Sequence, residues 1–523
     1  MTNYIPPEMK ERYEEARRLI ESSKDIKIYS HTDCDGISSG AILTGILKKI
    51  GREFGKDFNI EIVNLDVLEN VPIEHELTIF SDLGSGQPVD KNANKDSKIL
   101  ILDHHPPLRD IDYCNTVDYD YLEINPIFYG IDGSQEICGG GLCYLLAKEF
   151  GFTDLSWIGI LAAIGDIQNG KTGKLEGLNR TILKDAEEEG LVNVITNDLS
   201  LYGRQTRPLF VALSYFSDVN LEITNDQNRA LDLLKRLGIN TRNPVNDTSI
   251  RSCDLNQQDK FKLIKELINM ITKEIPSRYA IHAPKLVMGE SYEFANEEKY
   301  TFLRDASEFS TAMNACVRNE RPEVALKLLD LTIKRNEILS DNNVSVDIES
   351  DRAVVLDELE EISKAHRFYL AQNIKKIGES DSIVQMENIQ YFDGEGIRSN
   401  VVGTIAGMVL SQGDWRKPII AFTQVSEEND DLKISLRCSK LLAYDGVHFG
   451  KIIRKVSQSL GGNGGGHDVA CGAYIRKDQK EEFFDLMNKE LEGKLVLDWS
   501  FNTNLLFSIL FFLHIQLLRL LLK

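Results

Sequence analysis

The stretch Lys98-Ile-Leu-Ile-Leu-Asp-His-His-Pro-Pro107 decides the fold, because an apolar run ends abruptly in one carboxylate and two imidazoles. Residues 99–102 are continuously apolar, which is typical of a parallel strand that is buried on both faces. The two prolines end the strand, since proline cannot donate the hydrogen bond that a sheet requires. We therefore expect Asp103, His104 and His105 at the carboxyl end of a buried strand.

Three other segments repeat this design of an apolar element that leads to carboxylates or imidazoles. Residues 25–30 predict a strand, and a helical pattern follows it at 38–49. Residues 77–81 predict another strand, and residues 156–164 predict an apolar helix. In an open α/β sheet, ligands bind in the crevice beyond the carboxyl ends of the strands. The residues expected to meet there are His31, Asp33, Asp35, Asp82, Asp103, His104, His105 and Asp166.

The carboxylates of this crevice would repel one another and raise one another's pKa values unless cations bound them. Imidazole and carboxylate ligands without thiolate suit Mn, Mg or Zn, and their number here is enough for two ions. Two metals about 3.5 to 4 Å apart would stabilise both the attacking and the leaving oxygen of a phosphoryl displacement. One carboxylate must then bridge the two ions, and we expect Asp82 to be the bridge.

Four short motifs carry a resemblance to a known family: His31-x-Asp33-x-Asp35, Asp82, Asp103-His104-His105 and Asp166. Their order and spacing resemble the motifs of the DHH phosphoesterase superfamily. Near the C-terminus, Gly461-Gly-Asn-Gly-Gly-Gly-His467 resembles the glycine-rich signature of the accompanying DHHA1 domain. Within the superfamily, the chain is most similar to the archaeal RecJ-like single-strand-specific exonucleases, including the type associated with the GINS replication complex.

The resemblance implies a role for each site residue. It implies that His31 and Asp33 hold one metal ion and that Asp82 is shared. It further implies that Asp35, His104 and Asp166 hold the other ion, that Asp103 orients an imidazole, and that His105 faces the scissile phosphate. The expected cofactor is two divalent ions, Mn2+ in the first place and Mg2+ as the alternative. The implied substrate contacts are Arg437, Ser439, Asn463, Gly464, Gly465, Gly466 and His467.

The pattern around Arg437 supports a phosphate contact on its own. Residues 433–439 alternate polar and apolar positions, which predicts a strand with Ser435, Arg437 and Ser439 on one face. The planar guanidinium of arginine matches two phosphate oxygens, although a solvated arginine on an edge strand is the alternative. Residues 461–466 predict a loop whose amides can approach a nucleotide closely, because only Asn463 has a side chain.

Two further segments allow more than one interpretation. Gly139-Gly-Gly141 opens a predicted helix, so its amides are either an anion site or part of a tight turn. Arg204 and Arg207 are expected to form structural ion pairs, with contact to phosphate as the alternative.

A chain of 523 residues with 42% apolar content can form at least two hydrophobic cores. We predict an α/β fold with an N-terminal parallel-sheet DHH domain, a helical insert, a long linker helix and a smaller mixed α/β DHHA1 domain. Residues 341–351 are acidic and rich in turn formers, which predicts a boundary there. The expected domains are a catalytic domain with a leading helix at 1–210, an inserted, mainly helical lobe at 211–350, the linker helix at 351–380, the DHHA1 domain at 381–495 and an apolar tail at 496–523.

The formal net charge of -21 is unusual for a protein that binds nucleic acid, because affinity for phosphate comes largely from Lys and Arg. Charge is nevertheless distributed unevenly. Residues 432–455 contain one acidic residue, Asp445. The basic residues of the same segment outnumber it and predict a local basic patch, formed by Lys433, Arg437, Lys440, Lys451, Arg454 and Lys455.

Several features bear on the compartment. The eight cysteines are scattered without a C-x-x-C pair, and the N-terminus lacks an apolar signal segment, so we expect a cytoplasmic protein. The tail at 505–522 is strongly apolar but interrupted by His514, Gln516 and Arg519. An interfacial or partner-docking helix is therefore favoured over a membrane span, and membrane contact is not expected.

The preferred function is a two-metal-dependent exonuclease that hydrolyses single-stranded DNA or RNA to mononucleotides in DNA replication or repair. The expected partners are the single strand and the GINS or replicative helicase complex. One alternative keeps the chemistry but takes small substrates, as an oligoribonuclease, a pAp phosphatase or a cyclic-dinucleotide phosphodiesterase does. Another is a non-enzymatic replication scaffold similar to the eukaryotic relative Cdc45. The intact set of metal-binding residues favours the enzyme.

Overall fold

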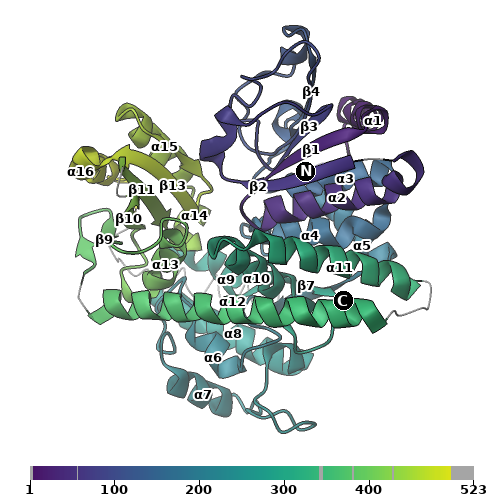
Figure 1. Cartoon of the computed structure of the whole chain (residues 1–523). Coiled ribbons are helices and arrows are strands. Elements are labelled where there is room, and N and C mark those ends of the chain that lie inside the picture. The colour runs from purple at the N-terminus through teal and green to yellow at the C-terminus, as the bar shows by residue number, and fades with distance from the viewer. Residues whose placement is uncertain (1–3, 56, 341–345, 380–381, 427–428, 496–523) are drawn as a thin grey trace. The chain divides into compact units, whose positions relative to one another are not determined.

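The computed structural model describes residues 4–55, 57–340, 346–379, 382–426 and 429–495 (Figure 1). The chain forms two compact units. The first unit comprises residues 1–197 and 290–366, and the second comprises 198–289 and 367–523, each with the gaps just given. Residues 211–350, which the sequence predicts as one inserted lobe, thus contribute helices to both units. The predicted domain boundaries stay predictions.

The first unit is built on a five-stranded parallel sheet with the order β2-β1-β3-β4-β5. Its central strands are short and apolar, and every residue of β3 is buried. The strands predicted from apolar runs are confirmed. The edge strands β2 and β5 are additions, and β2 has the alternating exposure of an edge strand. The strands are β1 (Asp25–His31), β2 (Asp57–Val63), β3 (Leu77–Ser81), β4 (Lys98–Leu102) and β5 (Asp120–Ile124).

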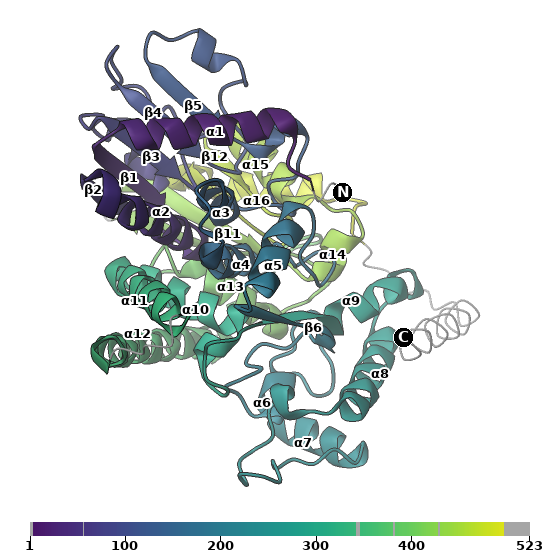
Figure 2. The same cartoon turned by 90° about the vertical axis from the view of Figure 1, so that its right-hand side faces the viewer.

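Helices of the first unit pack with one face of this sheet into a large apolar core. A smaller core on the other face includes Tyr29, Phe80 and Ile101. Figure 2 shows α1, the predicted leading helix, lying along β5. The helices are α1 (Pro7–Ser22), α2 (Cys34–Phe54), α3 (Gly139–Glu149), α4 (Ser156–Gly165), α5 (Leu178–Glu188), α10 (Ala306–Arg318) and α11 (Pro322–Ser340).

A two-stranded sheet and a long helix lie where the chain passes between the units. The two strands are β6 (Val192–Leu199) and β7 (Met288–Phe294). The long helix α12 (Val346–Glu379) covers the predicted linker helix up to Glu379. Residues 346–351 of the predicted boundary segment belong to this helix, and residues 341–345 lie outside the described residues.

The second unit contains a helical part and a mixed sheet with the order β12-β13-β11-β10-β9-β8. Helix α13 (Val402–Val409) packs on one face of this sheet, and α15 (Phe449–Ser459) with α16 (Lys480–Glu490) packs on the other. The remaining helices are α6 (Leu209–Ser214), α7 (Gln227–Arg236), α8 (Gln257–Glu274), α9 (Ala283–Val287) and α14 (Lys440–Tyr444). The strands are β8 (Val384–Gln385), β9 (Gln390–Asp393), β10 (Ile419–Ser426), β11 (Asn429–Arg437), β12 (Asn463–Gly466) and β13 (Ala470–Arg476).

The predicted fold class is confirmed: a parallel-sheet domain, a helical middle region with a long helix, and a mixed sheet. All eight cysteines lie in the described residues and are free thiols. No helix among the described residues combines the length and apolar character that a membrane crossing requires. The apolar tail at 496–523 lies outside the described residues.

Candidate metal centre

The candidate site lies where three neighbouring parallel strands end (Figure 1). His31 is the last residue of β1, and Asp82 and Asp103 directly follow β3 and β4. Parallel strands end at the same edge of a sheet, so these side chains meet there. Behind His31 the chain turns back so tightly that a Cβ on Gly36 would lie 2.2 Å from the His31 carbonyl oxygen. Only glycine fits at this turn, which delivers Asp33 and Asp35 to the same edge.

Asp82 is buried at the centre of the site. Its side chain is 1% exposed, and neither carboxylate oxygen has a hydrogen-bond partner among the described residues. Oδ2 lies 3.3 Å from Nδ1 of His31, and Oδ1 lies 3.2 Å from Nε2 of His104. The backbone at Asp82 has a φ of 59°, a left-handed conformation that costs free energy in a non-glycine residue. A strained, buried and unsatisfied carboxylate between two imidazoles indicates a ligand that the protein itself does not supply.

His104 is oriented by its backbone surroundings. Its Nδ1 lies 2.6 Å from the carbonyl oxygen of Gly133, and a Cβ on Gly133 would lie 2.2 Å from the His104 carbonyl oxygen. A proton on Nδ1 donated to that carbonyl leaves the lone pair of Nε2 free to bind a metal. Nε2 lies 3.6 Å from Oδ2 of Asp35. Asp166, at the end of α4, places Oδ2 3.9 Å from Nδ1 of His104.

Asp35 is held by the amino end of α3. The amides of Gly139 and Gly140 donate to its two carboxylate oxygens at 2.8 and 2.7 Å. These amides are therefore occupied by a protein carboxylate, so the alternative that they bind an anionic ligand is wrong. Burial and the neighbouring carboxylate of Asp82 raise the pKa of Asp35 well above its usual value. Such repulsion between buried carboxylates is relieved by a cation.

Asp103 is fully buried and contacts His105. Oδ1 of Asp103 accepts hydrogen bonds from the amide of His105 at 3.1 Å and from its Nδ1 at 2.8 Å. Burial alone would raise the pKa of Asp103, but the adjacent His105 ring and the Ser85 amide, which donates to Oδ2 at 2.9 Å, hold it below its usual value. The side chain of His105 is 44% exposed, so its Nε2 is available to a substrate.

The sequence did not single out several residues that support this site. Asn125, at the end of β5, donates through Nδ2 to the His105 carbonyl at 2.8 Å and to the Ser85 hydroxyl at 3.0 Å. Gln168 donates through Nε2 to Oδ2 of Asp166 at 2.9 Å. These contacts join segments that are distant in the chain, so no local sequence pattern predicts them.

The structure thus brings all eight predicted residues together, and they form overlapping groups whose candidate ligand atoms lie within 4.8 Å of one another. One group is His31, Asp33 and Asp82, and a second is Asp35, His104 and Asp166. A third group joins Asp82 to the Asp103-His104-His105 motif. The orphaned oxygens of Asp82 and the mixed imidazole and carboxylate donors fit a divalent metal. Which residue binds which ion stays a prediction.

The predicted substrate residues lie in the second unit. Arg437 ends β11, and its Nη1 donates to the Leu436 carbonyl at 2.8 Å. No carboxylate of the described residues pairs with Arg437, and burial lowers the pKa of its guanidinium. The predicted loop at 461–466 is wrong in part, because Asn463, Gly464, Gly465 and Gly466 form β12 and pair with β13. His467 stands in the turn that joins these two strands.

The prediction that Ser439 shares a strand face with Arg437 is wrong. Strand β11 ends at Arg437, and Ser439 is the fully buried N-cap of α14. Its hydroxyl donates to the Asp218 carbonyl at 2.7 Å and accepts from the Leu441 amide at 3.2 Å. Both bonds hold the start of a helix, so this hydroxyl is committed to the protein in the described structure.

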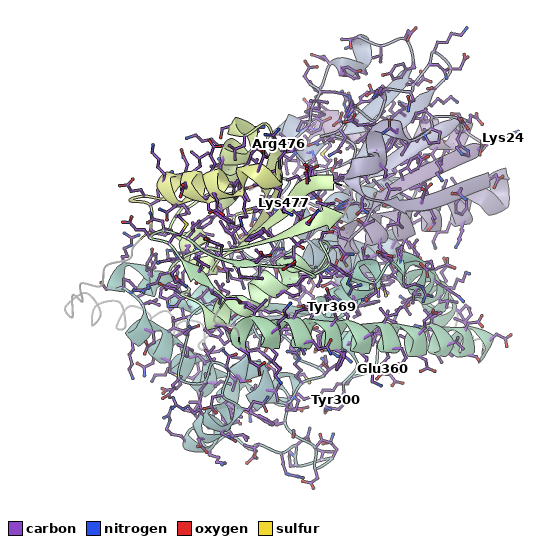
Figure 3. The ribbon with its side chains drawn as sticks, turned by 60° about the vertical axis from the view of Figure 1, so that its left-hand side comes forward. Lys24, Tyr300, Glu360, Tyr369, Arg476 and Lys477 are labelled. Carbon is purple, nitrogen blue, oxygen red and sulfur yellow. The ribbon has the colours of Figure 1, made fainter. Side chains whose placement is uncertain are left out.

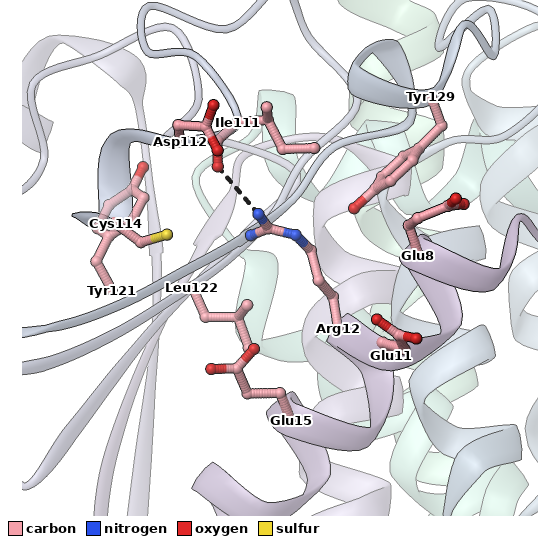
Figure 4. Close-up of a pocket in the computed structure, with 10 residues that line it drawn as sticks. All are labelled: Glu8, Glu11, Arg12, Glu15, Ile111, Asp112, Cys114, Tyr121, Leu122 and Tyr129. Carbon is pink, nitrogen blue, oxygen red and sulfur yellow. Dashed lines mark hydrogen bonds between the residues drawn. The ribbon is translucent and has the colours of Figure 1, made fainter. Parts of the chain in front are cut away.

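A pocket elsewhere in the first unit is lined by none of the eight predicted residues (Figure 4). It has a volume of about 330 Å³ and lies between α1, β5 and the segment around Asp112. Arg12 points into it and donates to the Ile111 carbonyl at 3.0 Å. The carboxylates of Glu8, Glu11 and Glu15 also line the pocket, which makes it a poor site for a phosphate.

Three domain models match the chain in order. The DHH family N-terminal domain matches residues 25–162, the DHH-CID domain matches 201–283, and the DHHA1 domain matches 384–493. Uncharacterized protein MJ0831 of Methanocaldococcus jannaschii is 29% identical over 503 residues, which cover 93% of this chain and 100% of that protein.

Two solved structures share the fold at low identity. RecJ from Thermus thermophilus in complex with Mn2+ has a TM-score of 0.53 and 14% identity over 93% of this chain. The chain spans 55% of that RecJ chain. CDC45 from Entamoeba histolytica has a TM-score of 0.52 and 15% identity, with 92% of this chain and 98% of CDC45 covered. These likenesses concern the fold alone.

Proposed function

We propose that this chain, which carries the DHH, DHH-CID and DHHA1 domains of the DHH/DHHA1 phosphoesterase superfamily, is a metal-dependent phosphodiesterase of the RecJ-like exonuclease kind. Its substrate is single-stranded DNA or RNA, which it shortens to mononucleotides in DNA replication or repair. The observation that carries this proposal is the buried Asp82 carboxylate, which lies between His31 and His104 and has no hydrogen-bond donor in the part of the chain that the structure describes.

The residues would hold two divalent ions, with Mn2+ preferred, in two sets that share Asp82. One set is His31 and Asp33, and the other is Asp35, His104 and Asp166. Bound divalent ions supply Lewis acidity toward the scissile phosphate and lower the pKa of water.

The protein's own groups act on orientation. The Gly133 carbonyl and Gln168 fix the His104 ring and the Asp166 carboxylate, respectively. Asp103 holds the His105 ring so that Nε2 faces solvent, where it can donate a hydrogen bond to a phosphate oxygen. This arrangement supports a role for His105 at the scissile group.

A nucleic-acid substrate is supported by the second unit. Arg437 is a desolvated cation without a carboxylate partner among the described residues, and a phosphate would supply the missing charge. The glycine-rich backbone of β12 also lets a ligand approach closely. We therefore propose Arg437, Asn463, Gly464, Gly465, Gly466 and His467 as contacts to the nucleotide.

The test is hydrolysis of single-stranded DNA and RNA oligonucleotides labelled at either end, with Mn2+, Mg2+ or EDTA. Shortening that requires metal and is lost in Asp82→Asn supports the proposal. Metal-dependent shortening that survives Asp82→Asn would contradict the assignment of Asp82. Cleavage of dinucleotides or cyclic dinucleotides without cleavage of longer strands would move the assignment to a small-substrate phosphodiesterase.

A scaffold role is a second candidate, because the chain shares its fold with CDC45 over 92% of its length. It predicts co-purification with GINS in the presence of EDTA. Inactivity on every nucleotide substrate together with such binding would favour the scaffold over the enzyme.

A further inference from the structure

One face of the mixed sheet in the second unit carries small residues, among them Ser435, Gly465 and Gly472. The strand register places Lys433 opposite Tyr474 and Ser435 opposite Gly472, and it places Gly465 of β12 beside Gly472. Residues opposite one another in antiparallel strands point to the same face. The other face carries Leu432, Ile434 and Leu436 into the apolar core. Helix α13 packs over part of the first face, because a Cβ on its Gly403 would lie 2.5 Å from Nη2 of Arg437 and 3.2 Å from Oγ of Ser435. We call the rest of this face the shelf, formed by Lys433, Gly465, Gly472 and Tyr474.

Cationic side chains lie close to the glycines of the shelf. A Cβ on Gly472 would lie 3.8 Å from Nζ of Lys433, and a Cβ on Gly465 would lie 3.0 Å from Nη2 of Arg454. Arg454 belongs to α15, so its side chain reaches past the edge strand β12 to this position. Within the described ranges, neither Lys433 nor Arg454 pairs with a carboxylate, and the same holds for Arg437. In a chain with a net charge of -21, such a group of uncompensated cations indicates an anionic ligand.

Tyr474 adds an aromatic surface to the shelf. Its side chain is 46% exposed although it occupies a central position of β13. Nζ of Lys433 lies over one face of its ring, 4.0 Å from the centroid, so a base would stack on the opposite face. Exposed aromatic rings beside cations on a sheet are the features by which proteins bind single-stranded nucleic acid, through base stacking and phosphate contacts.

We propose that the shelf holds a second nucleotide of a single strand, with its base stacked on Tyr474 and its phosphates contacted by Lys433 and Arg454. Lys433 and Arg437 are four residues apart on β11, or about 13 Å at the usual rise of a strand. Because the two backbone positions are this far apart, we assign the shelf to a different nucleotide from the one at Arg437. This inference rests on the proposed nucleic-acid substrate and adds a length dependence to it.

The experiment measures binding and not turnover. All proteins carry Asp82→Asn, and fluorescence anisotropy reports the affinity for a labelled single strand of about 16 nucleotides and for a labelled mononucleotide. Tyr474→Ala weakens binding of the long strand about 10-fold, whereas Tyr474→Phe retains the ring and binds as the parent does. Lys433→Gln lowers the slope of log affinity against log salt by about 0.7, as expected for one lost phosphate contact.

Lys477→Gln is the matched control. Lys477 follows β13 directly, and its replacement removes the same charge close by in the chain, but it lies beyond the strand, with Nζ 3.5 Å from Oε1 of Gln424 (Figure 3). The control variant leaves the affinity of both ligands and the salt slope at parent values. Circular dichroism melts accompany each variant, and the exposed position of Tyr474 predicts unchanged melting for Tyr474→Phe.

Equal affinity of Tyr474→Ala and its parent for the long strand would overturn the proposal. So would an equal loss of mononucleotide and long-strand binding, or a Tyr474→Phe variant as weak as Tyr474→Ala. The proposed function is tested separately, by hydrolysis with Asp82 intact. A Tyr474 effect on binding without any hydrolysis would support the shelf and contradict the proposed enzyme. Hydrolysis without a Tyr474 effect would support the enzyme and contradict the shelf.

Discussion

The metal centre carries unpaired negative charge, whereas the shelf carries unpaired positive charge. At the centre, Asp35 and Asp82 are almost fully buried, and Asp82 has no hydrogen-bond donor among the described residues on either oxygen. On the shelf and next to it, Lys433, Arg437 and Arg454 have no carboxylate partners among the described residues. A buried or clustered charge without its counterpart costs free energy, so each region indicates a ligand of the other sign. The overall charge of -21 conceals this division.

Replacement of Asp82 at the metal centre is expected to have the largest effect on the protein's activity. Asp82→Asn removes the shared metal ligand and abolishes metal-dependent hydrolysis. Added Mn2+ should raise the melting temperature of the parent but not that of the same variant, because a ligand that binds the folded state stabilises it. Hydrolysis assays and thermal melts with Mn2+ or EDTA check the two effects. An equal rise in melting temperature for both proteins would show that Asp82 does not hold the metal.

A buried cluster whose charges are paired within the protein contrasts with both the metal centre and the shelf. Asp198 is buried and accepts from Nε of Arg204 at 2.5 Å, while Nζ of Lys260 lies 2.5 Å from its other oxygen. This contact agrees with the structural ion pair expected for Arg204. Asp198→Asn leaves two buried cations unpaired and should lower the free energy of unfolding by about 3–5 kcal/mol. Urea unfolding at neutral pH measures the change, and a loss below about 1 kcal/mol, which is typical of an exposed pair, would contradict the account.

The pH dependence of stability follows from the same cluster. Burial would raise the pKa of Asp198, but Arg204 and Lys260 lower it below its usual value. A lowered pKa in the folded state means that the group stabilises the protein above its unfolded pKa and loses this contribution as the pH falls through the folded pKa. The parent should therefore lose stability in acid more steeply than Asp198→Asn. Parallel acid titrations of both proteins would contradict the cluster's role.

Arg437 should behave differently from Asp198. Arg437→Met removes a desolvated cation that has no carboxylate partner among the described residues, so the free energy of unfolding should stay constant or rise. Affinity for a phosphorylated mononucleotide should fall by about 1.5–3 kcal/mol, the contribution of hydrogen bonds to a charged group. Denaturation and equilibrium dialysis separate the two effects. A large loss of stability with unchanged nucleotide affinity would mean that Arg437 is structural.

Asn125 is expected to have the smallest effect. Asn125→Ala removes the bonds to the His105 carbonyl and the Ser85 hydroxyl, so the His105 ring is less well positioned. Turnover should fall about 10- to 100-fold, as is typical for residues that orient metal-site groups. The Mn2+ stoichiometry should not change. A matched variant is Asn115→Ala, whose side chain makes none of these contacts and should leave turnover unchanged.

The sequence predicted the strands and carboxylates of the first unit because both depend on local properties. An apolar run such as residues 99–102 forms a buried strand, and the polar residues after it must lie at the strand's end. The edge strand β2 alternates polar and apolar residues, which is itself a strand signal, but it lacks the continuous apolar run by which the central strands were predicted. Contacts from Gly133, Asn125 and Gln168 depend on how distant segments pack, which no local pattern encodes.

The second unit was harder to predict for a related reason. Residues 463–466 contain three glycines, which suggest a loop, yet ladder pairing with β13 makes them a strand. Ser439 continued the alternation of β11 in the sequence, but the strand ends two residues earlier and a helix cap uses the hydroxyl. At Gly139 and Gly140, the same amides that suggested an anion site bind Asp35.

The central claim is that the acidic centre is completed by divalent cations. Isothermal titration calorimetry of the metal-free protein with Mn2+ tests it without any assumption about the substrate. The account predicts two ions bound per chain, with binding of both impaired in Asp82→Asn because that carboxylate is shared. Identical Mn2+ titrations for the parent and Asp82→Asn, or no binding by either, would contradict it.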